Sequence, residues 1–164
     1  MSKPSSISAK SRILGGLWGV AVGDALGVPV EFCRREERER DPVADLRSGG
    51  PHKQQVGTWS DDTSLTLCTI DTLLKVGDNY RALGQSFVRW LNAEIWTPHG
   101  SVFDVGPTTD RAIRRIERGV PPLEAGGNDE YSNGNGSLMR MLPVAVAAEN
   151  LISGKRLGSH VVQS

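Results

Sequence analysis

The sequence has few aromatic side chains, few cysteines and no net charge. Aromatic residues make up 5% of its 164 residues, whereas its 19 glycines favour tight backbone contacts and functional loops. The 19 basic and 19 acidic residues cancel, so net charge provides no attraction to nucleic acid or to an anionic membrane. Cys33 and Cys68 form no CxxC pair, which argues against a zinc knuckle. Both have apolar neighbours, which predicts buried free thiols in a reducing compartment, the cytoplasm.

Long hydrophobic runs are also scarce. The one long apolar stretch, residues 13–32, contains Asp24 near its centre and five glycines. Because a charge in the middle of a bilayer costs about 3 kcal/mol, we do not expect this stretch to cross a membrane. Residues 1–12 are rich in Ser, Lys and Pro and lack the apolar core of a signal peptide, so they are predicted to be a disordered lead.

The sequence shows no strand alternation and no internal repeat, and its hydrophobic periodicity predicts an all-α domain. The expected helices cover residues 13–26, 61–75, a segment from 80 that ends before Pro98, 109–118, and a segment from 138 that Pro143 should kink. Between them, residues 41–58 and 126–137 are rich in Gly and polar residues and are predicted to be long loops.

Glycines recur every fourth residue in the first predicted helix, at positions 15, 19, 23 and 27. Each interior glycine costs roughly 1 kcal/mol relative to alanine, so the stripe predicts a close approach by another helix. Asp24 lies beside the stripe. A buried acid needs a partner, so Asp24 either makes structural hydrogen bonds or lines a polar cleft.

The segment Ser60-Asp61-Asp62 precedes the second predicted helix. A serine and two acids at a helix start are typical of capping and of a favourable interaction with the helix dipole. The same three oxygen-bearing side chains can instead converge just beyond the helix end, where a hard divalent cation would bind. Both interpretations are open from this segment alone.

Two further features, Glu31 and a glycine-rich segment, have a structural and a functional interpretation, and Asp104 is a lone acid in a loop. Glu31 has apolar neighbours and is either an exposed carboxylate or part of the same acidic site. Asp104 lies in a loop before Gly106-Pro107. The segment Gly134-Asn135-Gly136-Ser137 precedes a helix and is either an ordinary loop with Ser137 as a cap or a backbone cradle for phosphate. It matches neither of the common glycine-rich phosphate motifs.

Four segments occur in a fixed order: Gly23-Asp24-Ala25-Leu26-Gly27 followed by Glu31; Trp59-Ser60-Asp61-Asp62-Thr63; Phe103-Asp104-Val105-Gly106; and Gly134-Asn135-Gly136-Ser137-Leu138-Met139-Arg140. Together they resemble the ADP-ribosylglycohydrolase family, which includes dinitrogenase reductase-activating glycohydrolase and the ADP-ribosyl-acceptor hydrolases. The resemblance covers residues 13–148.

The resemblance implies an all-helical domain that holds two magnesium or manganese ions and cleaves the bond between ADP-ribose and an acceptor, often arginine. It places Ser60, Asp61 and Asp62 among the metal ligands. It makes Glu31, at the metal centre, and Asp104 the catalytic carboxylates. It also implies that Gly134, Asn135, Gly136 and Ser137 contact ADP-ribose. The expected partner is an ADP-ribosylated protein or a small ADP-ribose conjugate.

The sequence departs from the family pattern at its end. Family members continue with a second acidic run, Asp-x-Asp-Thr/Ser, whereas no aspartate follows Ala148 here. Residues 13–150 are therefore expected to be the N-terminal part of such a domain, and residues 151–164 a weakly patterned tail. Two alternatives to hydrolysis follow: a non-catalytic module that binds ADP-ribose or nucleotides, or a gene remnant without function.

Overall fold

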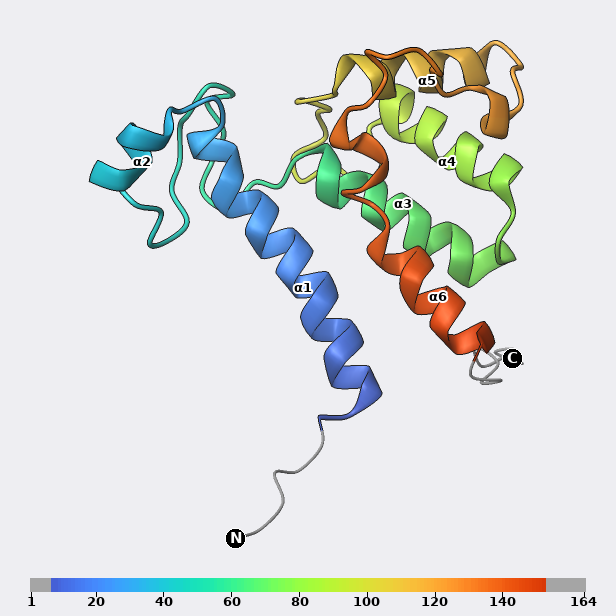
Figure 1. Cartoon of the computed structure of the whole chain (residues 1–164), viewed down its shortest axis with the longest axis horizontal. Coiled ribbons are helices and arrows are strands. Elements are labelled where there is room, and N and C mark those ends of the chain that lie inside the picture. The colour runs from blue at the N-terminus through green and yellow to red at the C-terminus, as the bar shows by residue number, and fades with distance from the viewer. Residues whose placement is uncertain (1–6, 153–164) are drawn as a thin grey trace, which may run out of the picture.

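The computed structural model describes residues 7–152, and within that range the chain is helical with no β-strand (Figure 1). These residues form six α-helices and three short 3-10 turns, which confirms the all-α prediction. The α-helices are α1 (Ala9–Gly27), α2 (Arg35–Arg40), α3 (Asp61–Val76), α4 (Tyr80–Ala93), α5 (Pro107–Glu117) and α6 (Leu142–Ile152). The 3-10 turns are η1 (Val28–Val30), η2 (Pro122–Glu124) and η3 (Asn135–Ser137).

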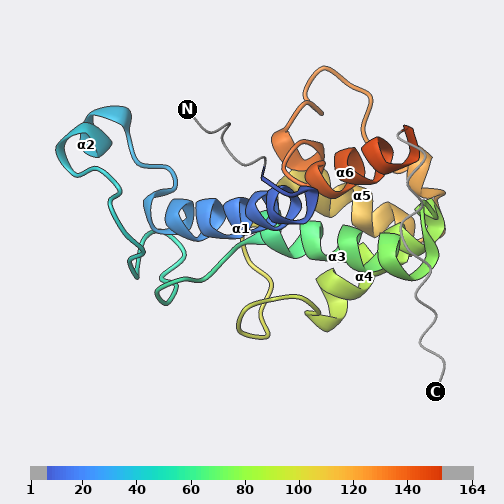
Figure 2. The same cartoon turned by 90° about the horizontal axis from the view of Figure 1, so that it is seen from below.

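Helix α3 is the centre of the molecule. It packs against α4, and α4 packs in turn against α5, so that these three helices form a stack (Figure 1). On its other sides α3 contacts α1 and α6, and Figure 2 shows α6 above it and α1 beside it. This arrangement buries much of α3, in keeping with apolar residues that lie nearly all round the helix.

The core forms where α3, α4 and α5 meet. Its fully buried members are Leu65, Cys68, Phe87, Trp90 and Ile113. Helix α3 also buries hydroxyl groups, which need acceptors inside the protein. The backbone provides these acceptors locally. The hydroxyls of Ser64, Thr69 and Thr72 each donate to the carbonyl oxygen four residues earlier, at 2.8–2.9 Å.

Several helix boundaries differ from the sequence prediction. Helix α1 begins at Ala9 because Ser8 caps it, its hydroxyl accepting a bond from Ser11 N at 3.1 Å. The predicted disordered lead is therefore wrong for residues 9–12, while residues 1–6 lie outside the described range. Helix α5 begins at Pro107, a residue suited to a first helical position.

The last helix also begins later than predicted. Residues 135–140 form a 3-10 turn and a further turn, and α6 starts at Leu142. Pro143 thus lies in the first turn of α6, where its missing N–H needs no helical acceptor, and it does not kink a longer helix. Of the predicted tail, residues 153–164 lie outside the described range.

The prediction of a close helix approach at the glycine stripe is wrong. Within residues 7–152, no atom lies within 4 Å of the position that a Cβ would take on Gly15, Gly19, Gly23 or Gly27. The tight contact is at Gly16 instead, whose Cβ would lie 3.2 Å from Leu142 of α6. The spacing of glycines identified a face without side chains, but not a helix that packs on it.

Helix α1 presents apolar side chains to solvent. Leu14, Trp18 and Val22 recur at helical spacing and are 45%, 69% and 45% exposed. With the turn that follows, Ala9–Val30 meets the length and hydropathy expected of a membrane span, with a mean hydropathy of 1.6, as core helices of soluble proteins also can. The prediction that this segment does not cross a membrane still rests on Asp24.

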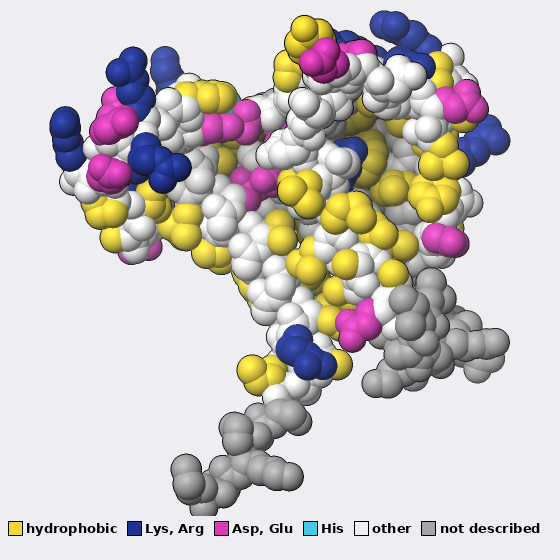
Figure 3. All heavy atoms as spheres, viewed as in Figure 1, with side chains coloured by type: hydrophobic (Ala, Val, Ile, Leu, Met, Phe, Trp, Pro, Cys, Tyr) yellow, Lys and Arg dark blue, Asp and Glu magenta, His cyan; other side chains and the backbone are white. Residues whose placement is uncertain are grey.

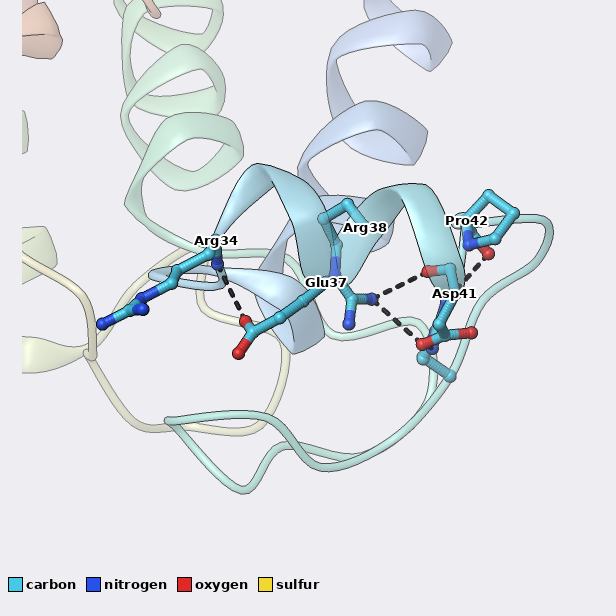
Figure 4. A network of polar contacts seen from close by, with 6 residues as sticks. Arg34, Glu37, Arg38, Asp41 and Pro42 are labelled. Carbon is cyan, nitrogen blue, oxygen red and sulfur yellow. Dashed lines mark hydrogen bonds and ion pairs between the residues drawn. The ribbon is translucent and has the colours of Figure 1, made fainter.

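Helix α2 lies apart from the stack of α3, α4 and α5 (Figure 1). Hydrogen bonds and ion pairs between charged side chains and the backbone stabilise both of its ends (Figure 4). At its start the backbone N–H of Arg34 donates to the Glu37 carboxylate at 2.8 Å. At its end Arg38 and Arg47 donate to the Asp41 carboxylate at 3.1 and 2.7 Å. The mixed-charge run is a solvated face, as predicted. Cys33, just before it, is exposed, so the prediction of two buried thiols is right only for Cys68.

We expect Leu65→Ala to destabilise the protein by about 2–5 kcal/mol, because Leu65 is 0% exposed and its truncation leaves a cavity in the core. Urea unfolding followed by far-UV circular dichroism measures this change. The matched control is Leu74→Ala on the same helix, where the side chain is 74% exposed and the expected change is within about 0.5 kcal/mol. Equal effects of the two substitutions would contradict the described packing of α3.

Candidate active site

The start of α3 is held by a carboxylate from α1. Asp24 accepts hydrogen bonds from the backbone N–H and the hydroxyl of Ser60 and from the same two groups of Thr63, at 2.6–3.0 Å. Ser60 is the N-cap residue of α3. A negative charge at this end also interacts favourably with the helix dipole. Asp24 therefore makes structural hydrogen bonds and lines the cleft described next, so both interpretations of it are correct.

All nine residues predicted for the site line one cleft of about 1000 Å³. Glu31 comes from the turn after η1, Ser60, Asp61 and Asp62 from the start of α3, and Asp104 from the loop before α5. The segment Gly134–Ser137 forms another wall. Figure 3 shows acidic side chains in the middle of this face, between the end of α1 and the start of α3. Their catalytic and ligand roles stay predictions.

Burial and neighbouring negative charges raise the pKa values of three carboxyl groups in the cleft, those of Asp61, Asp62 and Asp104. Burial, followed by the negative charges of Asp62, Asp104 and Asp24, raises the pKa of Asp61 from 3.8 to about 7. Burial and then the charge of Glu31 raise the pKa of Asp104 to about 6. The pKa of Asp62 is also raised, first by burial and then by Asp24 and Glu31. Hard oxygen donors that repel one another in this way fit a divalent cation, which would offset their charge.

Sequence reasoning missed His52. Its Nε2 lies 2.6 Å from Glu31 Oε2 and 3.5 Å from Asp104 Oδ1, and the three side chains form a group that could hold a metal ion. His52 lies within residues 41–58, whose composition predicts a long loop without indicating a role for this residue. The sequence shows only a single histidine between Pro51 and Lys53. No motif or regular spacing links it to residue 31 or residue 104.

Asp104 is placed in the cleft by an unusual backbone conformation. Its φ is +58°, a left-handed value that side chains other than glycine rarely adopt and that is often found at functional sites. The loop then enters α5 through Gly106 and Pro107. Thr109, in the first turn of α5, lies so close to Gly136 that a Cβ there would collide with its hydroxyl. The glycine-rich wall is thus packed directly on the start of α5.

Arg140 supplies a positive charge at the same cleft, and sequence analysis gave it no role. Its guanidinium lies 4.7 Å from the centre of the Phe87 ring, and its Nη1 is buried without a hydrogen-bond partner among residues 7–152. Burial lowers its pKa, and the charge of Asp61 opposes that change. An arginine retains its charge even so, because its ordinary pKa exceeds 12.

Ser60 is already engaged in the described structure. Its hydroxyl donates to Asp24 at 2.7 Å and accepts weakly from the backbone N–H of Asp62 at 3.4 Å. A hydroxyl has one donor and two acceptor lone pairs, so one lone pair is left for a cation. Its position is consistent with the predicted ligand role, which stays a prediction.

Comparisons with known proteins give a consistent result. The family described as ADP-ribosylglycohydrolase matches residues 5–159. The chain is 35% identical to ADP-ribosylarginine hydrolase Tri1 of Pseudomonas putida, over 88% of this chain and 38% of that protein. It is 33% identical to ADP-ribosyl-[dinitrogen reductase] glycohydrolase of Rhodospirillum rubrum, over 85% of this chain and 46% of that protein.

A solved structure described as an ADP-ribosylglycohydrolase-related protein complex is also similar. It superposes with a TM-score of 0.62 at 36% identity and covers 82% of this chain and 41% of that one. The chain therefore spans less than half the length of the relatives that it matches.

We expect Asp24→Asn to destabilise the protein by about 1–3 kcal/mol, since an amide offers one acceptor oxygen where two carboxylate oxygens now serve four donors. Chemical unfolding provides the measurement. Asp78→Asn, at an exposed position before α4, removes the same charge and should leave stability nearly unchanged. An unaltered unfolding midpoint for Asp24→Asn would show that this carboxylate does not hold the start of α3.

Proposed function

We propose, for a chain that belongs to the ADP-ribosylglycohydrolase family, that its cleft hydrolyses the bond between ADP-ribose and an acceptor, with arginine as the acceptor side chain. One observation carries this proposal: four segments far apart in the sequence bring their predicted residues to one cleft of about 1000 Å³. That volume suits a ligand of the size of ADP-ribose. The name of the Pseudomonas putida relative, an ADP-ribosylarginine hydrolase, supports arginine.

In this proposal Ser60, Asp61 and Asp62 hold two divalent metal ions, either magnesium or manganese. Glu31 lies beside these ions. Such an ion acts as a Lewis acid on substrate oxygens and lowers the pKa of a bound water. The acidic cleft fits this group because its donors are carboxylate and hydroxyl oxygens.

Other residues of the cleft would move the proton and bind the ADP-ribose. Asp104, which lies beside Glu31 and within 3.5 Å of His52 Nε2, accepts the proton of the attacking water. The wall of Gly134–Ser137 brings backbone close to the ligand, because glycine has no side chain to keep it away. The positive charge of Arg140 at the same cleft favours the pyrophosphate of ADP-ribose.

A second candidate function is binding of ADP-ribose without hydrolysis. It is favoured by the fact that the chain spans less than half of its relatives, whereas the glycine-rich wall and Arg140 are both present at the cleft. Binding and hydrolysis are separated by measuring both on the same protein.

We expect release of ADP-ribose from ADP-ribosylarginine in the presence of Mn²⁺, and we expect Asp104→Asn to slow it by at least about 10²-fold, the contribution of a positioned general base. Asp61→Asn should slow it as well by weakening metal binding. Asp78→Asn is the control and should keep the full rate, because Asp78 lies outside the cleft. Product is quantified by chromatography with and without EDTA.

Release that EDTA and Asp104→Asn leave unchanged would refute the hydrolase proposal. If the chain releases no ADP-ribose but binds it in calorimetry, the binding function is the correct one.

We expect Gly136→Ala to weaken ADP-ribose binding by roughly tenfold, or about 1.4 kcal/mol, because the new Cβ collides with the Thr109 hydroxyl and displaces the wall. Isothermal titration calorimetry measures the affinity. Gly15→Ala is the matched control: its Cβ meets nothing within 4 Å, and it lies on α1 away from the cleft. Equal affinities for both variants would show that the Gly134–Ser137 wall does not contact the ligand.

A further inference from the structure

The loop that carries His52 is built to place it. An antiparallel bridge joins Gly49 and Gln54 through two backbone hydrogen bonds of 2.8 and 3.2 Å, so the residues between them form a tight turn. Gly50 lies so close to Pro29 of η1 that a Cβ there would collide with the Pro29 backbone. The turn is thereby fixed next to Glu31, and the His52 side chain is 19% exposed.

One nitrogen of the His52 imidazole lies near two carboxylates from different parts of the chain. Nε2 is 2.6 Å from Glu31 Oε2 and 3.5 Å from Asp104 Oδ1, and the three ligand atoms all lie within 4.8 Å of one another. The rings of Phe103 and Phe32 flank it, with centroids 5.3 and 6.1 Å from that of His52. Apolar rings beside a metal site limit the access of water and strengthen its electrostatics.

We propose that Glu31, His52 and Asp104 form a mixed nitrogen and oxygen site that selects a transition-metal dication, Zn²⁺ or Co²⁺, over Mg²⁺. An imidazole nitrogen suits Zn²⁺, Co²⁺ and Ni²⁺, whereas Mg²⁺ prefers oxygen alone. This site lies beside the all-oxygen segment Ser60–Asp62 in the same cleft and includes Glu31 and Asp104, so a Zn²⁺ bound here would occupy the carboxylate that otherwise accepts the proton of the attacking water. It concerns metal binding only, so its failure would leave the hydrolase proposal standing.

The distances suit such an ion after a small adjustment. Bonds of 2.0–2.1 Å in a tetrahedral site place ligand atoms about 3.3 Å apart. The Nε2 to Asp104 distance of 3.5 Å already matches, and the Nε2 to Glu31 distance of 2.6 Å must open by roughly 0.7 Å. Glu31 can make that movement on its partly exposed side, since 31% of its side-chain surface is accessible to solvent.

The competing explanation is that His52 only donates a hydrogen bond to the two carboxylates and holds them in place. The two explanations differ in what His52→Gln does to metal affinity. Glutamine retains a hydrogen-bond donor but offers no imidazole nitrogen, so it preserves the second role and removes the first.

The experiment titrates the full chain with Zn²⁺ by calorimetry, and with Co²⁺ by visible absorption, each in excess Mg²⁺. We expect both ions to bind despite Mg²⁺, and His52→Gln to weaken Zn²⁺ binding at least about tenfold without changing Mg²⁺ binding. The matched control is His99→Gln. His99 bonds Thr58 Oγ1 at 3.0 Å and is not part of the group, so Zn²⁺ affinity should be unchanged.

A second measurement keeps the test independent of how His52→Gln folds. In the unaltered protein, Zn²⁺ should shift the imidazole nitrogen resonance of His52 and leave those of the other histidines in place, with assignment from His99→Gln and His160→Gln. The proposal is overturned if Zn²⁺ binds no better than Mg²⁺, if a folded His52→Gln variant binds Zn²⁺ as tightly as the unaltered chain, or if the His52 resonance does not respond.

Discussion

The site depends on a single carboxylate. Asp24, near the end of α1, accepts four donor groups of Ser60 and Thr63 and so fixes the first turn of α3. Asp61 and Asp62 lie within that turn, and their direction into the cleft follows from it. The same contact joins α1 to the central helix, so one interaction sets both the packing of the outer helix and the position of the acidic pair.

The cleft concentrates negative charge that the fold alone does not neutralise. Asp61 and Asp104 have raised pKa values because burial and neighbouring carboxylates disfavour their charged forms. His52 and Arg140 are the positive or hydrogen-bonding groups that face them among the described residues. Conflicts of this kind are typical of functional sites, where binding of an ion or substrate relieves a strain that the rest of the structure maintains.

The sequence predicted those parts of the structure that local signals specify. Ser60 as a cap and the acids after it are tied to the start of α3, whereas Gly134 precedes a 3-10 turn and Gly136 lies within it, and neither marks the predicted helix start; all of them line the same cleft. Contacts made by loops were not predictable, because nothing in the order of residues brings His52 to Glu31. The glycine stripe of α1 failed for a related reason: spacing describes one helix face, but not its neighbour.

The convergence of distant segments has a consequence for folding. The residues that line the cleft are separated along the chain by helices and loops, and each intervening segment must fold back before the carboxylates meet. Helices form from local contacts and can exist before this assembly, whereas the cleft cannot. We therefore expect its carboxylates to come together late in folding and to separate early in partial unfolding. A ligand that bridges them would then slow the opening of the helical bundle.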